Sequence, residues 1–176
     1  GDLTFMFREA VGAEGRVVGT DVNADMLSLA EQKSGEREFP GIDWEIQDAQ
    51  ALPYEDDAFD IVSIAYGVRN VEEPRRALES MARVTKPGGR VIILEFGQPP
   101  APLKPFYWAY NRMVIPVVGG IVSGEPGAYR YLQRTSDDFP SGEDFLEMMR
   151  QTGVYSEVEA HSFMTGINYV YKGVVA

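Results

Sequence analysis

A short polar segment near the middle of the chain carries the side chains best suited to chemistry. Arg69 and Asn70 come shortly after an apolar run that ends at Tyr66. Guanidinium and amide groups donate hydrogen bonds, and a guanidinium hardly ever loses its proton. Arg69 is therefore a poor general base and is better suited to stabilising negative charge. The alternative is structural, with Arg69 in a surface ion pair with Glu72 or Glu73 and Asn70 capping a helix.

Acidic residues stand where two other strand-like runs end. Asp21 lies 19 residues after Asp2, which suits a carboxylate that accepts hydrogen bonds from both hydroxyls of a ribose. The alternative is an acidic helix N-terminus, because Asp21 and Asp25 both precede a predicted helix. Asp48 is either an acceptor for an adenine amine or an ordinary turn residue.

Strand-like and helix-like segments alternate along the chain, the pattern of an α/β domain with a mostly parallel sheet. The final two strands are expected to form an antiparallel edge. Asn23 or Asp25 is a suitable cap for the second helix. The run 61–65 is expected to be the more buried strand, and 86–89 a turn. Helices are predicted over residues 3–11, 24–33, from Pro74 onward and 141–152, and strands over residues 16–20, 42–47, 61–65, 90–96, 156–163 and 168–174.

The predicted order of elements brings the polar segments together. In open α/β sheets ligands bind beyond the carboxyl ends of the strands, so Gly1 and Asp2, Asp21, Asp48 and residues 66–70 should converge on one crevice. We expect one domain over residues 1–176, with a substrate-covering insertion at about 98–140. The aromatic stretch within it is either a folded lid or an exposed patch that contacts a membrane.

Composition excludes several classes of function. The net charge is −11, with 16 Lys and Arg against 27 Asp and Glu, whereas a nucleic-acid binder needs a basic face. The absence of cysteine excludes disulfides, a thiolate nucleophile and cysteine-ligated zinc. The acidic clusters lack the spacing of a calcium loop, so no metal site is predicted. No stretch reaches the roughly 18 apolar residues that span a bilayer.

Recognisable motifs occur along the chain at residues 1–5, 19–21, 48–53, 57–60, 66–71, 83–89, 94–96 and 129–132. Together these motifs resemble the ubiquinone/menaquinone C-methyltransferase family over essentially the whole chain. The runs at 57–60 and 86–89 are common to many class I methyltransferases, whereas those at 66–71 and 129–132 are narrower signals.

This resemblance implies a Rossmann-like class I methyltransferase fold, a doubly wound, mostly parallel sheet with helices on both faces. It implies methyl transfer from S-adenosyl-L-methionine to a ring carbon of a polyprenylated benzoquinol or naphthoquinol. Arg69 would stabilise the developing phenolate and Asn70 would orient the same oxygen, with Tyr66, Tyr129 or a water as base. Where a histidine is expected near the C-terminus, this chain has Tyr169 and Tyr171, so a base from that region is not predicted.

The resemblance also assigns binding residues. It implies that Gly1, Asp2 and Thr4 border the methionine moiety of the cofactor. The other implied cofactor contacts are Asp21 at the ribose, Asp48 and Ala49 at the adenine, and also Val22 and Ala65. The implied substrate contacts are Phe106, Tyr129 and Tyr131.

The expected setting follows from the lipid-tailed substrate. The resemblance implies peripheral contact with the cytoplasmic face of a bacterial inner membrane or the matrix face of the mitochondrial inner membrane. A quinone-biosynthesis complex or a homodimer is the expected assembly. The alternatives are a non-catalytic ligand-binding or scaffold subunit and an NAD-dependent reductase, although the reductase would need a glycine fingerprint before Asp21.

The start of the chain looks like the tail of a glycine-rich cofactor loop. A central first strand is missing from the visible sequence, and a sheet without it would leave backbone groups unpaired at two internal edges. We therefore expect the natural protein to extend upstream with an apolar strand and a further glycine-rich turn.

Overall fold

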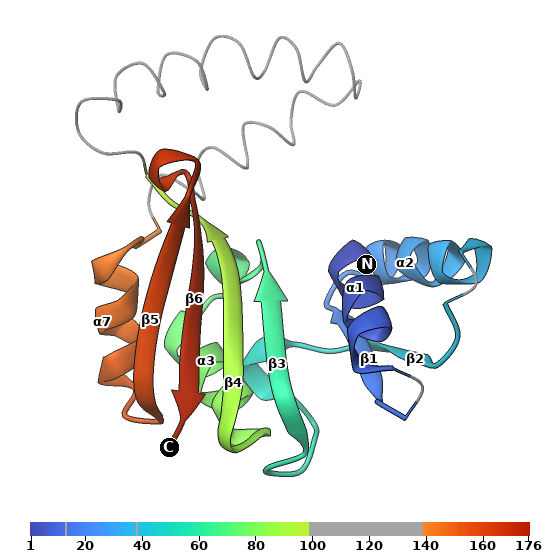
Figure 1. The fold of residues 1–176 in the computed structure, drawn as a ribbon, viewed down its shortest axis with the longest axis horizontal. Helices are drawn as coiled ribbons and strands as arrows, with labels where there is room; N and C mark the ends of the chain where they lie inside the picture. The colour runs from blue at the N-terminus through green and yellow to red at the C-terminus, as the bar shows by residue number, and fades with distance from the viewer. Residues whose placement is uncertain (13, 38, 99–138) are drawn as a thin grey trace, which may run out of the picture. The chain divides into compact units, whose positions relative to one another are not determined.

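A computed structural model describes residues 1–12, 14–37, 39–98 and 139–176 of the chain (Figure 1). These residues fall into two compact units, Gly1–Pro53 and Tyr54–Ala176. Each unit has its own sheet, with two strands in the first and four in the second. The single domain over residues 1–176 and the upstream first strand stay predictions.

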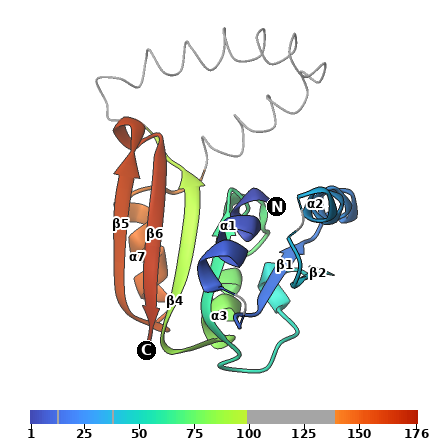
Figure 2. The same ribbon diagram turned by 45° about the vertical axis from the view of Figure 1, so that its right-hand side comes forward.

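The first unit is built on a parallel pair of strands (Figure 2). β1 pairs with β2 in a register that places Asp21 opposite Ile46. Phe5 is buried in this unit, with its ring stacked on Phe39 at 5.1 Å and edge-on to Trp44 at 6.0 Å. The elements of the unit are α1 (Asp2–Val11), β1 (Val17–Asp21), α2 (Ala24–Glu36), β2 (Ile42–Ile46) and the 3₁₀ turn η1 (Ala49–Ala51).

Local hydrogen bonding sets where α2 begins. The Asn23 side chain accepts from the backbone N–H groups of Asp25 and Met26. Of the two predicted candidates, Asn23 and Asp25, it is therefore Asn23 that caps the helix. The helix continues to Glu36, three residues beyond the predicted end at Lys33. α1 likewise includes Asp2, which the sequence had placed in a loop.

The second unit holds a mixed sheet in the order β3-β4-β6-β5 (Figure 1). β3 and β4 are parallel, and β6 runs antiparallel to both β4 and β5, so the predicted antiparallel C-terminal edge is confirmed. The elements of the unit are β3 (Phe59–Ala65), the 3₁₀ turn η2 (Val68–Asn70), α3 (Pro74–Arg83), β4 (Thr85–Phe96), α7 (Glu143–Gln151), β5 (Tyr155–Phe163), the 3₁₀ turn η3 (Met164–Gly166) and β6 (Asn168–Val175).

Two sequence predictions in this unit need correction. β3 is half-buried rather than buried, with Ile61 50% exposed, because in the described residues it pairs with β4 on one side alone. The predicted turn at 86–89 lies inside β4 as an irregularity, where the register jumps between the Phe59–Thr85 pair and the Ile61–Arg90 pair. Gly88 has φ +75 there, a conformation that favours glycine.

The core of the second unit forms where α3 and α7 pack on the sheet. The two helices contact each other and β4 or β5, so they lie on the same face (Figures 1 and 2). Phe145 of α7 packs on Tyr171 of β6, with ring centroids 4.6 Å apart. The fully or almost fully buried side chains of this core include Ala77, Leu78, Met81, Val91, Ile93, Phe145, Met149 and Tyr171.

None of the helices in the described ranges combines the length and the apolar character that a membrane-spanning segment needs. The insertion predicted at about 98–140 lies almost entirely outside the described residues, as does the aromatic stretch within it.

Truncation of Leu78 tests the assignment of this core. Leu78 is fully buried, so Leu78→Ala is expected to lower the free energy of unfolding by about 2–5 kcal/mol through lost burial and a residual cavity. Arg76→Ala on the same helix removes an exposed side chain and is expected to cost less than about 0.5 kcal/mol. Urea unfolding of the purified proteins measures both, and equal effects would contradict the packing of α3 on the sheet.

Candidate active site

The loop that follows β3 brings Tyr66, Arg69 and Asn70 together. The Tyr66 N–H donates to the Leu94 carbonyl at 2.8 Å, which continues the pairing of β3 with β4. The Tyr66 carbonyl then accepts from Arg69 Nη1 at 2.9 Å and from Asn70 Nδ2 at 3.3 Å. Val68, which is fully buried, anchors the turn between them. The three residues predicted as catalytic therefore form one hydrogen-bonded cluster.

Tyr66 adopts an unusual backbone conformation in this cluster. Its φ is +54, in the left-handed region that non-glycine residues seldom occupy. Such conformations persist where the surroundings hold them, and they concentrate at functional sites. Here the two side-chain donors on the Tyr66 carbonyl help to hold the conformation.

Arg69 makes a buried ion pair with Glu95 of β4. Arg69 Nη1 lies 2.5 Å from Glu95 Oε1, and the two side chains are only 7% and 1% exposed. The guanidinium also lies over the Phe96 ring, 5.1 Å from its centroid. The sequence had offered a surface pair with Glu72 or Glu73, so both the partner and the burial differ from that alternative. Glu95 was missed, although an acidic residue inside an apolar strand was a usable signal.

The Tyr66 hydroxyl is positioned by a residue from the far end of the chain. It donates to Asn168 Oδ1 at 3.1 Å, and the Tyr66 ring packs on Phe96 with centroids 4.5 Å apart. Asn168 begins β6 and pairs with Phe96 across the sheet, which explains how it reaches the loop. No sequence signal pointed to Asn168, because its proximity depends on the register of β6.

In the first unit, the predicted ribose and adenine residues lie at the carboxyl ends of β1 and β2. Asp21 Oδ1 accepts from the Asn23 N–H at 2.8 Å, and the Asp21 carbonyl accepts from the Gln47 N–H at 3.2 Å. Asp48 Oδ1 accepts from the Gln50 N–H at 2.9 Å, just before Ala49 opens η1. Both carboxylates therefore have the local turn and capping contacts that the structural alternative predicted.

The other predicted cofactor residues are placed as follows. Gly1 caps α1, and a side chain there would meet Ala30 at 2.8 Å. Asp2 pairs with Arg37 at 3.3 Å, and Thr4 lies on α1 beside Gly19 of β1. Val22 is 66% exposed beside Asp21, and Ala65 is half-buried at the end of β3.

The predicted substrate residues Phe106, Tyr129 and Tyr131 lie outside the described residues. The convergence of residues 66–70 with Asp21 and Asp48 stays a prediction, because these residues belong to two different units.

Two tyrosines near the core are unsuitable as bases. The Tyr171 hydroxyl accepts from the Gly142 N–H at 2.7 Å, and burial raises the pKa of Tyr171 above its ordinary value. Burial, with a smaller contribution from Glu79, likewise raises the pKa of Tyr155, whose hydroxyl donates to the Leu78 carbonyl at 2.8 Å. Both hydroxyls stay protonated near neutral pH and serve the packing of the unit.

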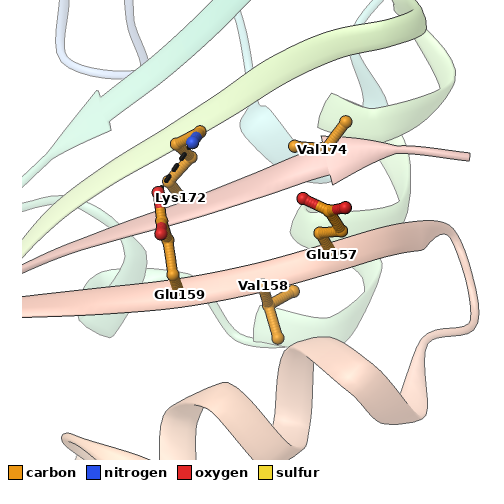
Figure 3. Close-up of a pocket in the computed structure, with 5 residues that line it drawn as sticks. All are labelled: Glu157, Val158, Glu159, Lys172 and Val174. Carbon is orange, nitrogen blue, oxygen red and sulfur yellow. Dashed lines mark hydrogen bonds and ion pairs between the residues drawn. The ribbon is translucent and has the colours of Figure 1, made fainter.

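A hollow on the sheet lies apart from the Tyr66–Asn70 loop. Lys172 Nζ donates to Glu159 Oε1 at 2.6 Å in this hollow, and the contact holds the pKa of Glu159 below its ordinary value. Lys172 pairs with Ile92 on β4, four residues back from the Phe96–Asn168 pair. The Lys172 and Glu159 charges therefore balance each other within the hollow. The lining residues are Glu157, Val158, Glu159, Lys172 and Val174 (Figure 3).

In the part of the chain that the structure describes, no group of three or more His, Cys, Asp or Glu side chains is arranged to hold a metal ion. The cluster around Tyr66 offers a different kind of chemistry. A phenol, an amide and a guanidinium lie on one turn, which suits hydrogen bonding to an oxygen on which charge develops.

Comparison with known proteins gives three consistent findings. A model of the ubiE/COQ5 methyltransferase family matches residues 1–175. The chain is 46% identical to the "Ubiquinone/menaquinone biosynthesis C-methyltransferase UbiE" of Bdellovibrio bacteriovorus, over 99% of this chain and 74% of the relative. It is 41% identical to the "2-methoxy-6-polyprenyl-1,4-benzoquinol methylase, mitochondrial" of Pongo abelii, over 90% of this chain and 49% of the relative.

The solved structure of a SAM-dependent methyltransferase from Aquifex aeolicus is also similar. Its TM-score is 0.66 at 15% identity, and the match covers 97% of this chain and 74% of that one. At this identity the likeness establishes the fold alone. The predicted Rossmann-like α/β class is confirmed.

The buried hydroxyl of Tyr171 gives a prediction about pH. Tyr171→Phe is expected to cost about 0.5–1.5 kcal/mol near neutral pH, because the Gly142 N–H loses its acceptor. The raised pKa of Tyr171 means that its contribution to stability is complete below the unfolded value of about 10 and is lost as pH rises above it. The variant should therefore lose less stability than the parent between about pH 9 and about pH 11.

Urea unfolding at a series of alkaline pH values measures this difference. Tyr155 stays in both proteins with its own raised pKa, so the alkaline loss should shrink without disappearing. Equal alkaline loss in the two proteins would show that the Tyr171 hydroxyl ionises as readily in the folded state as in the unfolded state.

Proposed function

This chain belongs to the ubiE/COQ5 methyltransferase family, and we propose that it methylates a ring carbon of a polyprenylated benzoquinol or naphthoquinol with S-adenosylmethionine as donor. The observation that carries the proposal is 46% identity, over nearly the whole chain, to a relative named for C-methylation in ubiquinone and menaquinone biosynthesis. The clustered phenol, amide and guanidinium at residues 66–70 suit the same chemistry.

The reaction makes specific demands on the site. An ionised quinol hydroxyl supplies electron density to the ring carbon, which attacks the donor methyl group. The carbon–carbon bond forms as the sulfur–methyl bond breaks, S-adenosylhomocysteine leaves, and the ring carbon then loses its proton. Alignment of the ring with the methyl group accordingly supplies much of the rate.

We assign the loop after β3 to the quinol oxygen. Asn70 is exposed and would orient the oxygen through its amide, and the Arg69 guanidinium, whose charge Glu95 largely balances, would add a weaker stabilisation of the phenolate. Tyr66 is 37% exposed and donates its proton to Asn168, which leaves oxygen lone pairs to accept from a quinol hydroxyl. This contact would orient the quinol hydroxyl, and the base stays one of three candidates, of which Tyr66 is the first. Tyr129 lies outside the described residues, and a water is the third candidate.

We assign the first unit to the cofactor. Asp21 and Asp48 would accept from the ribose hydroxyls and the adenine amine, because both carboxylates lie at the same end of the β1–β2 pair. The exposed side chains of Val22 and Ile46 offer apolar surface beside them for a purine ring. Gly1, Asp2, Thr4, Ala49 and Ala65 are proposed as the remaining cofactor contacts.

We also propose a membrane-facing setting, because a polyprenyl tail partitions into lipid. The expected location is the cytoplasmic face of a bacterial inner membrane or the matrix face of the mitochondrial inner membrane. A homodimer or a quinone-biosynthesis complex would deliver the substrate, with Phe106, Tyr129 and Tyr131 as proposed contacts. A non-catalytic scaffold is disfavoured by the methyltransferase relatives, as is an NAD-dependent reductase.

One experiment tests the reaction and the substrate together. The full-length gene is introduced into a host that lacks its own quinone methyltransferase, and the quinones are analysed by mass spectrometry. Restored methylated ubiquinone indicates a benzoquinol substrate, and restored methylated menaquinone a naphthoquinol. Restoration of neither, with the protein present and folded, would contradict the proposed function.

Substitution of Asp21 separates the ribose contact from the turn. Asp21→Ala is expected to weaken S-adenosylhomocysteine binding by about 1.5–3 kcal/mol through loss of charge-assisted hydrogen bonds. Asp21→Asn keeps an oxygen for the Asn23 N–H while it removes the charge, so it should also weaken binding with the turn intact. Calorimetry on the full-length protein provides the measurement.

Asp43→Asn is the matched control for Asp21→Asn. Asp43 is an exposed residue of β2 that pairs with Arg16 at 3.0 Å, so the substitution removes one charge from the same unit away from the proposed ligand. If Asp21→Ala, Asp21→Asn and Asp43→Asn all bind S-adenosylhomocysteine as tightly as the parent, Asp21 has only its structural role in the turn.

Substitutions in the loop after β3 should act on turnover. Asn70→Ala is expected to lower kcat by about 100-fold while S-adenosylhomocysteine affinity stays within about twofold, because the amide acts on charge that appears in the transition state. Tyr66→Phe keeps the ring on Phe96 and removes the hydroxyl, so it isolates the contribution of the hydroxyl. Steady-state kinetics with a short-chain quinol measures both, with Arg76→Ala as the exposed control. A rate within twofold of the parent for Asn70→Ala would exclude the orienting role.

A further inference from the structure

Glu95 is a buried carboxylate that the proposed chemistry does not use. It lies on β4 two residues beyond Ile93, and the whole residue is 0% exposed. Oε1 accepts from Arg69 Nη1 at 2.5 Å and from the Phe96 N–H at 2.8 Å, and Oε2 accepts from the Arg69 N–H at 3.4 Å. Glu95 thus holds both the backbone and the side chain of one loop residue.

Stability alone does not explain this arrangement. Removing a carboxylate and a guanidinium from water is costly, and a well-packed apolar pair of similar volume is often as stable or more stable. Val91 and Ile93, which precede Glu95 at alternate positions of β4, are apolar and fully buried. An apolar residue at position 95 would continue that pattern. The carboxylate at this position therefore indicates a role in setting the geometry of the neighbouring loop.

The contacts of Glu95 continue directly into the proposed catalytic loop. The guanidinium that Glu95 holds donates in turn to the Tyr66 carbonyl, which also accepts from Asn70. That carbonyl belongs to the residue with φ +54. The chain of contacts therefore runs from β4, a central strand of the sheet, through Arg69, to the backbone of the residue that carries the exposed Tyr66 side chain.

We propose that Glu95 is a positioning residue for methyl transfer, which sets the geometry of the Tyr66–Asn70 loop through its buried pair with Arg69. This inference rests on the proposed function. Glu95 itself touches neither quinol nor cofactor. It fixes where the Arg69 charge lies and keeps the Tyr66 carbonyl in the conformation that presents the phenol and the amide to the substrate.

The main test is Glu95→Gln, which keeps the size of the side chain and removes its charge. We expect kcat to fall by about 100-fold, because misplacement of catalytic groups by roughly 1 Å costs that much, and S-adenosylhomocysteine affinity to change by less than about threefold. Glu159→Gln is the matched control. It removes the carboxylate of another ion pair of the same sheet, Glu159–Lys172, and should leave kcat unchanged.

A double-mutant cycle separates positioning from general destabilisation. If Glu95 acts through Arg69, the double variant Glu95→Gln/Arg69→Gln should be no slower than Arg69→Gln alone. Removal of both charges also avoids an unpaired buried charge, so the double variant keeps the test open if Glu95→Gln fails to fold. Additive losses of kcat, or a parent-like kcat in folded Glu95→Gln, would overturn the proposal.

A readout without turnover separates this inference from the proposed function. Amide hydrogen exchange of Tyr66 and Arg69 should speed up in Glu95→Gln more than exchange of Val91 on the same sheet. If the parent protein methylates no quinol but the loop amides respond in this way, the proposed function fails and the structural role of Glu95 stands. If the parent is active and the loop amides do not respond, the positioning role fails.

Discussion

Burial of the Glu95 carboxylate constrains the loop that follows β3. A charge in the protein interior has to be neutralised and hydrogen-bonded where it lies. Arg69 meets that demand only if the chain turns sharply after β3 and brings the guanidinium within 2.5 Å of β4. The left-handed conformation of Tyr66 is part of that turn. The positions of the Arg69 guanidinium and of the Tyr66 carbonyl that it contacts follow from this pairing.

The alternating side-chain pattern of β4 couples the position of Glu95 to the packing of the core. Val91, Ile93 and Glu95 occupy alternate positions and are all buried. The side-chain period that packs β4 therefore also places the carboxylate at the end of the strand. On the next strand, the register opposite Phe96 brings Asn168 to the Tyr66 hydroxyl. A shift of one residue in either strand would separate these groups, so the antiparallel edge and the Tyr66–Asn70 loop depend on each other.

Asp21 and Asp48 show that a local structural role and a ligand role are compatible. Each carboxylate accepts from a backbone N–H two residues further along the chain. Such a contact holds the side chain in one orientation before any ligand arrives. A carboxylate held in this way loses little further freedom on binding, which favours the ribose and adenine contacts that we propose for it.

The sequence alone determined the features that depend on local chemistry. The order of helices and strands and a cap at Asn23 or Asp25 follow from side-chain periodicity and short-range hydrogen bonds, and the motif at residues 66–70 indicated the loop that we propose as catalytic. The tertiary structure decided which candidates are neighbours. Glu95 and Asn168 reach the loop through strand pairing, and β3 is half-buried because of its single partner in the described sheet. Strand order and register join residues that are 26 and 102 positions apart, and no local pattern encodes that choice.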